Sequence, residues 1–475
     1  MKPMCRRFAA NALLCLLLIL RITQASAQRT GTYHQIVSGV PLLDDRGHIV
    51  SAHGANIIKD GGRYYLFGEA HSDTSNAFVG FNCYSSADLY NWKFERVALP
   101  LQDSGRLGPD RVGERAKVLK CKKTGEYVML MHSDDHKYMD PCVGYATASS
   151  VAGPYVFKGP LLFNGQPIHK WDIGSFVDDD GAGYLLIHGG LMYRLSDDFH
   201  SISKLVVDNH WRGAEAPTVF KKNGVYYWIA SDLTSWERND NFYYTATALE
   251  GPWTSRGNFA PAGTLTWNSQ ASFVLPVAGK ADTTFMFMGD RWSYPHQASA
   301  ATYVWLPLKV SGTSISISKY YDVWQVDSGS GKNASGQLTG EQVTSNAKTL
   351  NYQGNWSSYS FGKYAARRSD TKGDRLSLNF HGKQLGIYSI LGPEGGYATV
   401  TVFNSKKERV CSFVVDTYSK YECRSLVMLT PVMAAGDYAV TISINGDHGS
   451  WSDKRKSIYG SKGNYFAFQS AVVVK

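Results

Sequence analysis

Short apolar runs joined by tight turns recur along the first two thirds of the chain. Between residues 212 and 232, apolar runs at 218–220 and 226–230 flank the turn Lys221-Lys222-Asn223-Gly224. An Asn-Gly pair between two β-rich runs predicts a hairpin. The pattern occurs four more times, and aligning the aromatic residue of each second run gives the series Tyr65, Tyr127, Tyr184, Tyr227 and Phe285. Hairpins repeated at roughly 40 to 60 residues are typical of propeller blades, so residues 28–327 are predicted to form a five-bladed β-propeller.

One position of this repeat carries polar side chains. Counting back four residues from the apolar core of each first run reaches Glu114, Asp172, Glu215 and Gln270, while His53 stands there in the first copy. The innermost strands of a propeller line its axis, so equivalent positions should converge on one cavity. We expect three carboxylates and one amide to ring a candidate site. The competing interpretation is that these are ordinary polar residues at strand ends.

The two ends of the chain have different patterns. Residues 1–27 combine a basic start, a short apolar run and the small residues Ala25-Ser26-Ala27, which predicts a signal peptide and a secreted or periplasmic protein. No other segment approaches the length of a membrane span. Residues 328–348 read as a linker, and 349–475 as an all-β sandwich that is a candidate carbohydrate-binding domain. No candidate site residue lies beyond Trp292, so we expect residues 345–475 to fold separately and to be dispensable on short oligosaccharides.

Composition narrows the function classes. The net charge is +9, and loss of the four cations of the signal leaves about +5, too little and too dispersed to indicate nucleic-acid binding. Aromatic residues make up 13% of the chain, which suits stacking on sugar rings but also an aromatic-rich β core. Five cysteines follow the signal, and Cys411 and Cys423 flank an expected hairpin and are the best candidates for a disulfide. We expect a monomer.

Several motifs together resemble glycoside hydrolase family 43. They are Glu114-Arg115-Ala116-Lys117-Val118, the run from Asp172 to Gly181, Glu215-Ala216-Pro217, Trp267-Asn268-Ser269-Gln270 and Gly289-Asp290-Arg291-Trp292. The chain is most similar to the exo-β-1,3-galactanase branch. The resemblance implies inverting hydrolysis of galactan with Glu215 as general acid. Most of the wider family has an aspartate base at the first inner strand, but here that place reads His53-Gly54-Ala55-Asn56. The galactanase branch instead has a glutamine, matching Gln270, that holds the nucleophilic water.

The chemistry at these positions can be argued from the residue types. As the acid, Glu215 must be protonated near neutral pH, and the like charge of Asp172 can raise its pKa. Gln270 is a neutral amide without useful basicity, so it would orient water and pass through an imidic-acid form. Three alternatives remain for Glu114: it relays protons or tunes Gln270, it is itself the base, or it grips a sugar hydroxyl.

Further residues match the branch pattern or suit sugar binding. Candidate substrate-binding residues are Glu69, Arg115, Tyr138 and Thr234, with Trp236 and Trp292 as aromatic platforms. No cofactor is expected. The resemblance leaves room for a structural calcium ion near a histidine such as His296, although one histidine is no metal signature. The rival functions are another family 43 exo-enzyme, such as an arabinofuranosidase or xylosidase, and a non-catalytic galactan-binding propeller.

Overall fold

The computed structural model describes residues 32–453 and 456–475, so the predicted signal peptide lies outside the described residues. Strands dominate this part of the chain, and its only helical segments are the single turns η1 (Gly105–Leu107) and α1 (Leu265–Asn268). The all-β class is therefore confirmed. Across the described ranges, no helix has the length and apolar character needed to cross a membrane.

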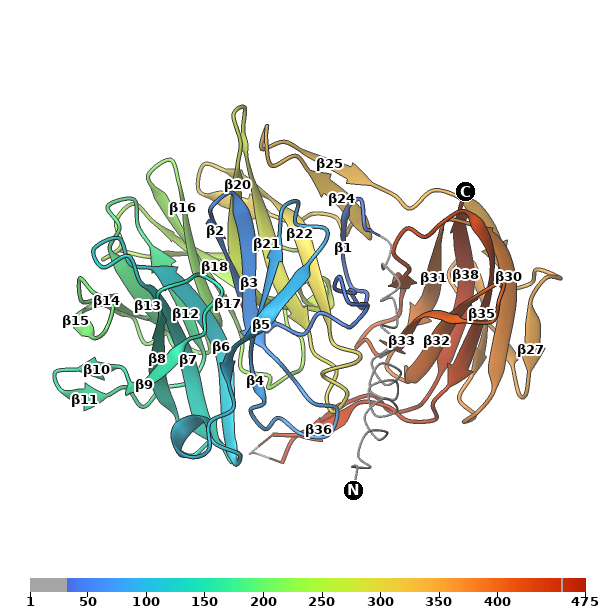
Figure 1. Ribbon diagram of the computed structural model, residues 1–475, viewed down its shortest axis with the longest axis horizontal. Coiled ribbons are helices and arrows are strands. Elements are labelled where there is room, and N and C mark those ends of the chain that lie inside the picture. The colour runs from blue at the N-terminus through green and yellow to red at the C-terminus, as the bar shows by residue number, and fades with distance from the viewer. Residues whose placement is uncertain (1–31, 454–455) are drawn as a thin grey trace, which may run out of the picture.

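Five sheets occupy the N-terminal part, antiparallel except for the parallel pairing of β10 with β15 (Figure 1). The first two contain β2 (His53–Asp60), β3 (Arg63–Glu69), β4 (Gly80–Ser86) and β5 (Lys93–Pro100), then β6 (Arg111–Lys120), β7 (Tyr127–Asp135), β8 (Cys142–Ala148) and β9 (Val156–Pro160). The third contains β12 (Ile173–Val177), β13 (Gly183–Ile187), β14 (Leu191–Leu195) and β15 (Ile202–Asp208), with β10 (Leu162–Phe163) and β11 (Gln166–Pro167) at its edge. The last two contain β16 (Glu215–Lys222), β17 (Val225–Ser231), β18 (Phe242–Ala246) and β19 (Thr254–Asn258), then β20 (Gln270–Ala278), β21 (Thr283–Arg291), β22 (Thr302–Ser311) and β23 (Ser314–Ser316).

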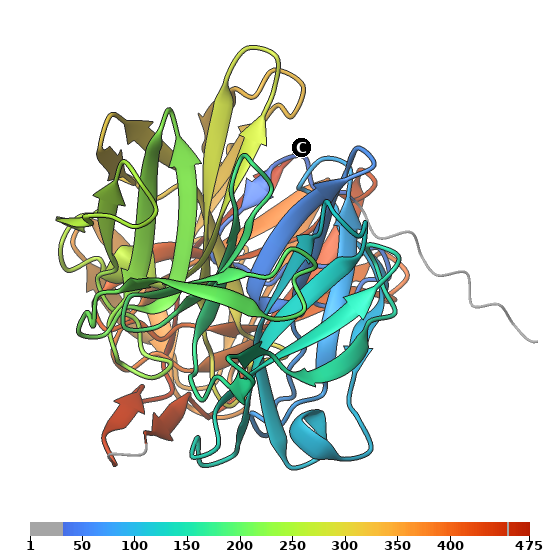
Figure 2. The same cartoon turned by 90° about the vertical axis from the view of Figure 1, so that its left-hand side faces the viewer.

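The first strands of these sheets contact one another in a cycle. β2 contacts β6, β6 contacts β12, β12 contacts β16, β16 contacts β20, and β20 contacts β2. The five-bladed propeller stays our interpretation of this arrangement, which places the start of every first strand near one centre. Figure 2 views the same sheets from the side opposite the C-terminal domain.

Local turn chemistry explains the hairpin on which the repeat was recognised. β16 and β17 pair with Phe220 opposite Tyr227. Asn223 and Gly224 between them have φ of +50° and +77°. Positive φ at both central residues defines the type I′ turn, whose twist matches that of the flanking strands. The Asn-Gly hairpin prediction is confirmed.

The C-terminal part packs two sheets face to face. One contains β26 (Glu341–Thr344), β28 (Ser357–Phe361), β29 (Tyr364–Ser369), β31 (Gln384–Leu391), β34 (Cys423–Leu429) and β38 (Phe466–Val474). The other contains β27 (Asn351–Gln353), β30 (Arg375–Gly382), β32 (Tyr397–Asn404), β33 (Arg409–Asp416) and β35 (Gly436–Ile444). A separate hairpin, β36 (Ser450–Ser452) with β37 (Ile458–Gly460), belongs to neither sheet.

The predicted Cys411–Cys423 disulfide is wrong, because both cysteines are free. Cys411 lies on β33, which pairs with β32, whereas Cys423 lies on β34, which pairs with β31. The chain therefore crosses from one sheet of the sandwich to the other between them instead of forming a hairpin. Both side chains contribute to the apolar layer between the sheets.

The two parts of the molecule share buried surface. In the range predicted as linker, β25 (Asn333–Gly336) pairs with β24 (Val323–Val326), which also pairs with β1 (Ile36–Val37), and β26 pairs with β38. One apolar cluster contains Trp324 of the N-terminal part together with Tyr388, Leu426 and Val472 of the sandwich. Each part therefore covers apolar surface of the other, and independent folding of residues 345–475 stays a prediction.

Candidate active site

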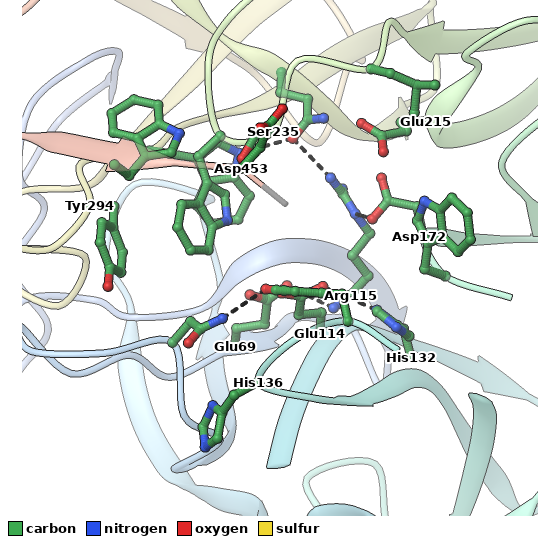
Figure 3. A pocket seen from close by; sticks show the side chains of 18 of the residues that line it. Glu69, Glu114, Arg115, His132, His136, Asp172, Glu215, Ser235, Tyr294 and Asp453 are labelled. Atoms are coloured by element: carbon green, nitrogen blue, oxygen red, sulfur yellow. Dashed lines mark hydrogen bonds and ion pairs between the residues drawn. The ribbon is translucent and has the colours of Figure 1, made fainter. Parts of the chain in front are cut away.

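A cavity of about 880 Å³ opens where the first strands begin (Figure 3). Nine of the sequence-predicted site residues line it: Glu69, Glu114, Arg115, Tyr138, Asp172, Glu215, Trp236, Gln270 and Trp292. Thr234 does not line the cavity. Its hydroxyl donates to the backbone oxygen of Glu237 within its own loop, and its neighbours Leu233 and Ser235 face the cavity instead.

A repeated backbone irregularity positions the polar side chains. The strand register shifts just after His53, Glu114 and Glu215, the site positions of their sheets. The residue that follows each has positive φ: +58° at Gly54, +51° at Arg115 and +52° at Ala216. Bulges of this kind re-aim a side chain out of the strand alternation and are common beside active sites. Because the same irregularity recurs in these strands, the residues four positions before each apolar core occupy equivalent places at the cavity.

Arg115 connects the residues of three sheets. Its Nε donates to Asp172 Oδ1 at 2.8 Å, and its Nη2 donates to Gln270 Oε1 at 2.9 Å. Its backbone N–H donates to Glu69 Oε1 at 2.7 Å. A Cβ at Gly54 would collide with the same carboxylate, so only glycine lets Glu69 approach here. The guanidinium is buried and is the positive charge around which the cavity floor is arranged.

The two neighbouring carboxyl groups have opposite pKa shifts. Burial alone would raise the pKa of Asp172, but the Arg115 guanidinium and the Ala216 N–H, 2.9 Å from Oδ2, outweigh burial and hold this pKa below its usual value. Burial, followed by the negative charge of Asp172, raises the pKa of Glu215 well above its usual value, against the opposing charge of Arg115. Asp172 is therefore ionised while Glu215 keeps its proton.

Gln270 is held by three hydrogen bonds. Its Oε1 accepts from Arg115 and also from Trp292 Nε1, at 2.9 Å in both cases. Its Nε2 donates to Ser231 Oγ at 3.0 Å. The carbonyl oxygen has two lone pairs, so both are occupied, and one N–H remains beyond the Ser231 bond. Trp292 is only 4% exposed, and its indole N–H fixes the position of the Gln270 side chain at the cavity.

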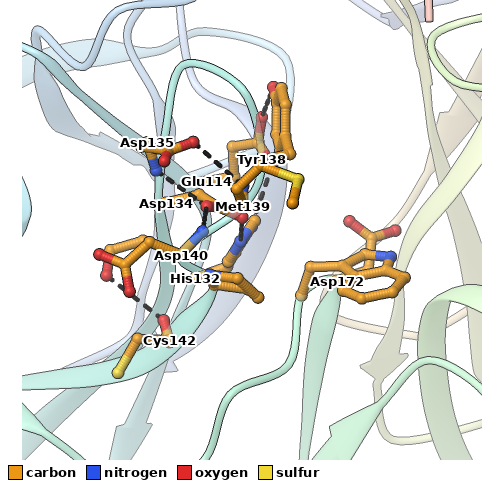
Figure 4. Close-up of polar contacts among 12 residues, drawn as sticks. Glu114, His132, Asp134, Asp135, Tyr138, Met139, Asp140, Cys142 and Asp172 are labelled. Atoms are coloured by element: carbon orange, nitrogen blue, oxygen red, sulfur yellow. Dashed lines mark hydrogen bonds and ion pairs between the residues drawn. The ribbon is translucent and has the colours of Figure 1, made fainter. Parts of the chain in front are cut away.

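Glu114 belongs to a chain of acidic groups around a buried histidine (Figure 4). Tyr138 OH donates to Glu114 Oε1 at 2.7 Å, and His132 Nδ1 lies 3.1 Å from Oε2. His132 Nε2 lies 3.2 Å from Asp134 Oδ2. Burial lowers the pKa of His132, but the hydrogen bonds to Asp134 and Glu114 outweigh it and raise the pKa to about 9. The imidazole is therefore charged at neutral pH and lies between two carboxylates.

Sequence reasoning missed several residues of the cavity. Trp171 precedes Asp172, and His136 follows β7 in the same loop as Tyr138. An aromatic residue beside a site carboxylate could have been noticed. Tyr294, and Trp451, Ser452 and Asp453 of the β36–β37 hairpin, also line the cavity. The expectation that the C-terminal domain lies outside the site is therefore wrong.

A calcium ion at the centre does not fit the residues present. The Lys117 amino group donates to the backbone oxygens of Gly54, Ala55 and Ser272, at 2.7, 2.8 and 3.1 Å, and so occupies the space between β2 and β20. His296 lies elsewhere, 3.2 Å from an Asp447 carboxylate oxygen. No group of three or more metal-ligating side chains with suitable geometry occurs in residues 32–453 and 456–475.

Comparisons with known proteins place the chain among glycoside hydrolases. Residues 49–262 match the family model of glycosyl hydrolases family 43. An exo-β-1,3-galactanase from Phanerochaete chrysosporium, solved with galactose, is 28% identical, with a TM-score of 0.71 over 92% of this chain and 100% of that one. A Bifidobacterium bifidum s17 protein described as an exo-β-1,3-galactanase is 35% identical over 59% of this chain and 95% of that one, with a TM-score of 0.55.

A curated relative extends the range of similar activities. The β-D-galactofuranosidase of Aspergillus niger is 26% identical over 208 residues, which are 41% of this chain and 60% of the relative. The chain thus spans less than two thirds of that relative's length. Together with the family match and the 35% identity to a galactanase-like structure, the arrangement of paired carboxyl groups leads to one conclusion: the chain belongs to glycosyl hydrolase family 43 and is a glycoside hydrolase.

Proposed function

We propose that this enzyme releases galactose from the non-reducing end of β-1,3-galactan with inversion of configuration, and that its five sheets are the blades of a propeller. The similar galactanase structures, one of them with bound β-1,3-galactotriose, support the substrate class. The predicted signal peptide supports export, and we propose that the protein acts as a monomer outside the cytoplasm. The observation that carries the proposal is the unequal pair of carboxyl groups, Asp172 and Glu215.

Glu215 is the general acid of this mechanism. Glycoside hydrolysis requires a protonated carboxyl group at the leaving oxygen. Burial and the charge of Asp172 raise the pKa of Glu215, so it can donate a proton near neutral pH. Asp172, kept ionised by Arg115, maintains this shift through each cycle.

Gln270 holds the nucleophilic water through its remaining N–H. Direct protonation of Oε1 is disfavoured because Arg115 and Trp292 already donate to both lone pairs. These donors stabilise negative charge on the oxygen and so favour an imidate anion, which forms when Nε2 gives up its remaining proton and whose nitrogen then accepts the water proton. The proton that the amide gives up must pass to another group, and we assign this relay to Glu114, because the adjacent Arg115 donates to Gln270 Oε1.

Two hydrogen bonds influence what Glu114 can do. It accepts from Tyr138 and from the charged His132, so each of its carboxylate oxygens already has a donor. This favours Glu114 as a relay or tuning group, or as a grip for a sugar hydroxyl, over Glu114 as the base.

The test is to incubate the protein with β-1,3-galactan, arabinan and xylan and to identify the sugars released. Galactose from galactan, appearing first as the α-anomer by NMR, is the expected result. Arabinose or xylose alone would assign the protein to another exo-activity of the family. A galactofuranoside belongs in the panel because of the Aspergillus niger relative. Binding of galactan without release of any sugar would favour a lectin-like role.

A further inference from the structure

The β36–β37 hairpin reaches from the sandwich to the cavity. In Figure 1, β36 lies below the N-terminal sheets, away from the two sandwich sheets, and Figure 2 shows the hairpin beneath the strands coloured green. Trp451, Ser452 and Asp453 of this hairpin are part of the cavity wall. Ligand pockets usually have volumes of about 300–1,000 Å³. The volume of this cavity, about 880 Å³, is near the upper end of that range. The cavity therefore has room for more than one ring.

Aromatic rings from both parts of the molecule meet at this wall. Trp236 and Tyr294 stack with ring centroids 4.6 Å apart and an interplanar angle of 18°. Trp451 approaches Trp236 at 6.4 Å and 62°, and its other neighbour is Tyr459, stacked at 6.0 Å and 19°. All three of Trp236, Tyr294 and Trp451 line the cavity. In Figure 3, Tyr294 lies on the side opposite Asp172 and Glu215, and Asp453 lies between them near Ser235.

The sandwich also fixes the two propeller segments that carry these rings. Tyr418 OH donates to Glu237 Oε2 at 2.6 Å, next to Trp236 in sequence. Ser293 Oγ donates to Asp416 Oδ2 at 2.9 Å, next to Tyr294, and Tyr397 OH donates to the Ser293 backbone oxygen at 3.0 Å. Glu237 and Ser293 are each 2% exposed, so these bonds lie inside the interface. The aromatic wall is therefore built and held across both domains.

We propose that Trp451, with Trp236 and Tyr294, forms a subsite for the galactosyl units on the leaving-group side of the cleaved bond. The inference rests on the proposed exo-action: the terminal sugar lies among the carboxyl groups, so rings at the opposite wall meet the rest of the chain. The axial O4 of galactose leaves the C–H groups at C3, C4 and C5 on one face, which suits stacking on tryptophan. The sandwich is then a part of the active site.

The test compares Trp451→Ala with Trp356→Ala. Trp356 is a half-buried tryptophan of the same domain that packs on Tyr352 and does not line the cavity. We expect Trp451→Ala to lower kcat/KM on β-1,3-galactotriose by roughly tenfold, the size of one lost aromatic contact. Inhibition by free galactose, which reports the innermost position, should stay within twofold of wild type. Trp451→Phe should recover most of the loss, and Trp356→Ala should behave as wild type.

Three outcomes would overturn the subsite. Unchanged kcat/KM on the trisaccharide would show that Trp451 makes no productive contact. An equal loss of galactose inhibition, or a Trp451→Phe variant as impaired as Trp451→Ala at unchanged melting temperature, would indicate a distorted cleft. If the wild-type enzyme cleaves no galactan, the proposed function fails. The subsite is then judged by calorimetry with β-1,3-galactotriose, where equal affinities of wild type and Trp451→Ala would reject it.

Discussion

Single residues acquire their roles from the charges beside them. Asp172 and Glu215 start from similar carboxyl chemistry, and Arg115 Nε donates a hydrogen bond to Asp172 Oδ1. That contact keeps Asp172 ionised, and its charge adds to burial in raising the pKa of Glu215. Two identical functional groups thus divide into a stabilising anion and a proton donor.

This division predicts the pH dependence of activity. Activity requires Glu215 protonated, so it falls as pH rises through the raised pKa of Glu215. Asp172→Asn removes the negative charge, and Glu215 then loses its proton at lower pH. We expect the alkaline limb of the kcat/KM profile to move to lower pH, only in part because burial remains.

The control for this prediction is Asp179→Asn, an exposed aspartate that pairs with Lys221. Its profile should match wild type. Glu215→Gln has no proton to donate and should be inactive on galactan at every pH. An alkaline limb that stays in place in Asp172→Asn would contradict the charge coupling.

Gln270 gives a second prediction at this scale. Gln270→Ala removes the water-holding amide, and loss of one positioned catalytic group typically costs about 10²–10⁴ in rate. We expect kcat on galactotriose to fall by that order while galactose still binds. Gln270→Glu places another carboxylate next to Glu114 and Asp172 and should also be impaired, or active with a shifted pH optimum.

Steady-state kinetics and galactose binding measure both variants, with Gln325→Ala, at an exposed strand position, as control. Near-normal turnover of Gln270→Ala together with an inactive Glu114→Gln would show that Glu114 is the base.

At the scale of elements, strand β6 supplies both chemistry and support. Its bulge turns Glu114 and Arg115 towards the cavity, and two residues later Lys117 reaches the backbone of β2 and β20. Burial lowers the pKa of Lys117 to about 7. The strand therefore ties three first strands together directly beneath the site.

Removal of the Lys117 ammonium should destabilise the protein. Lys117→Met removes a donor from the backbone oxygens of Gly54 and Ser272, whereas Ala55 O still accepts from Ser272 Oγ, and each buried unsatisfied group costs about 1–3 kcal/mol. We expect a clear fall in the urea midpoint of unfolding. Lys120→Met, at an exposed position of the same strand, should stay near wild type because a surface pair with Asp60 contributes little. Equal midpoints for the two variants would refute a central role of Lys117.

At the scale of the whole molecule, the two domains form one structure around the cleft. They share an apolar cluster, and Tyr388 OH donates to Asp322 Oδ2 across the interface at 3.0 Å. Burial of apolar area is the main favourable term in folding, so each domain stabilises the other.

Deletion of residues 337–475 should therefore harm more than polysaccharide binding. It exposes the apolar surface around Trp324 and removes the Trp451 wall. We expect a lower melting temperature and a loss of activity on galactotriose. A folded, monomeric truncated protein with full-length kcat/KM would contradict this expectation and restore the view of the sandwich as a separate module.

The sequence alone determined the repeated part of this protein. Hairpin turns and alternating apolar residues are local features of the sequence. Because the hairpins repeat, equivalent residues of the first strands lie around the same cavity. The position of Gln270 relative to Glu215 could thus be predicted before any coordinates. Glu69, Arg115 and Tyr138 were predicted instead from the resemblance to the galactanase branch, and all three line the cavity.

Only the tertiary structure decided the contacts that the repeat does not encode. Trp451 reaches the cavity from another domain, and Cys411 and Cys423 lie on opposite sheets because the chain changes sheet between β33 and β34. The Lys117 side chain extends from β6 to the backbone of β20, which is far away in the sequence. Such contacts depend on how folded segments pack against one another. The burial of apolar surface that drives this packing is non-directional, so no local sequence pattern predicts which residues will be in contact.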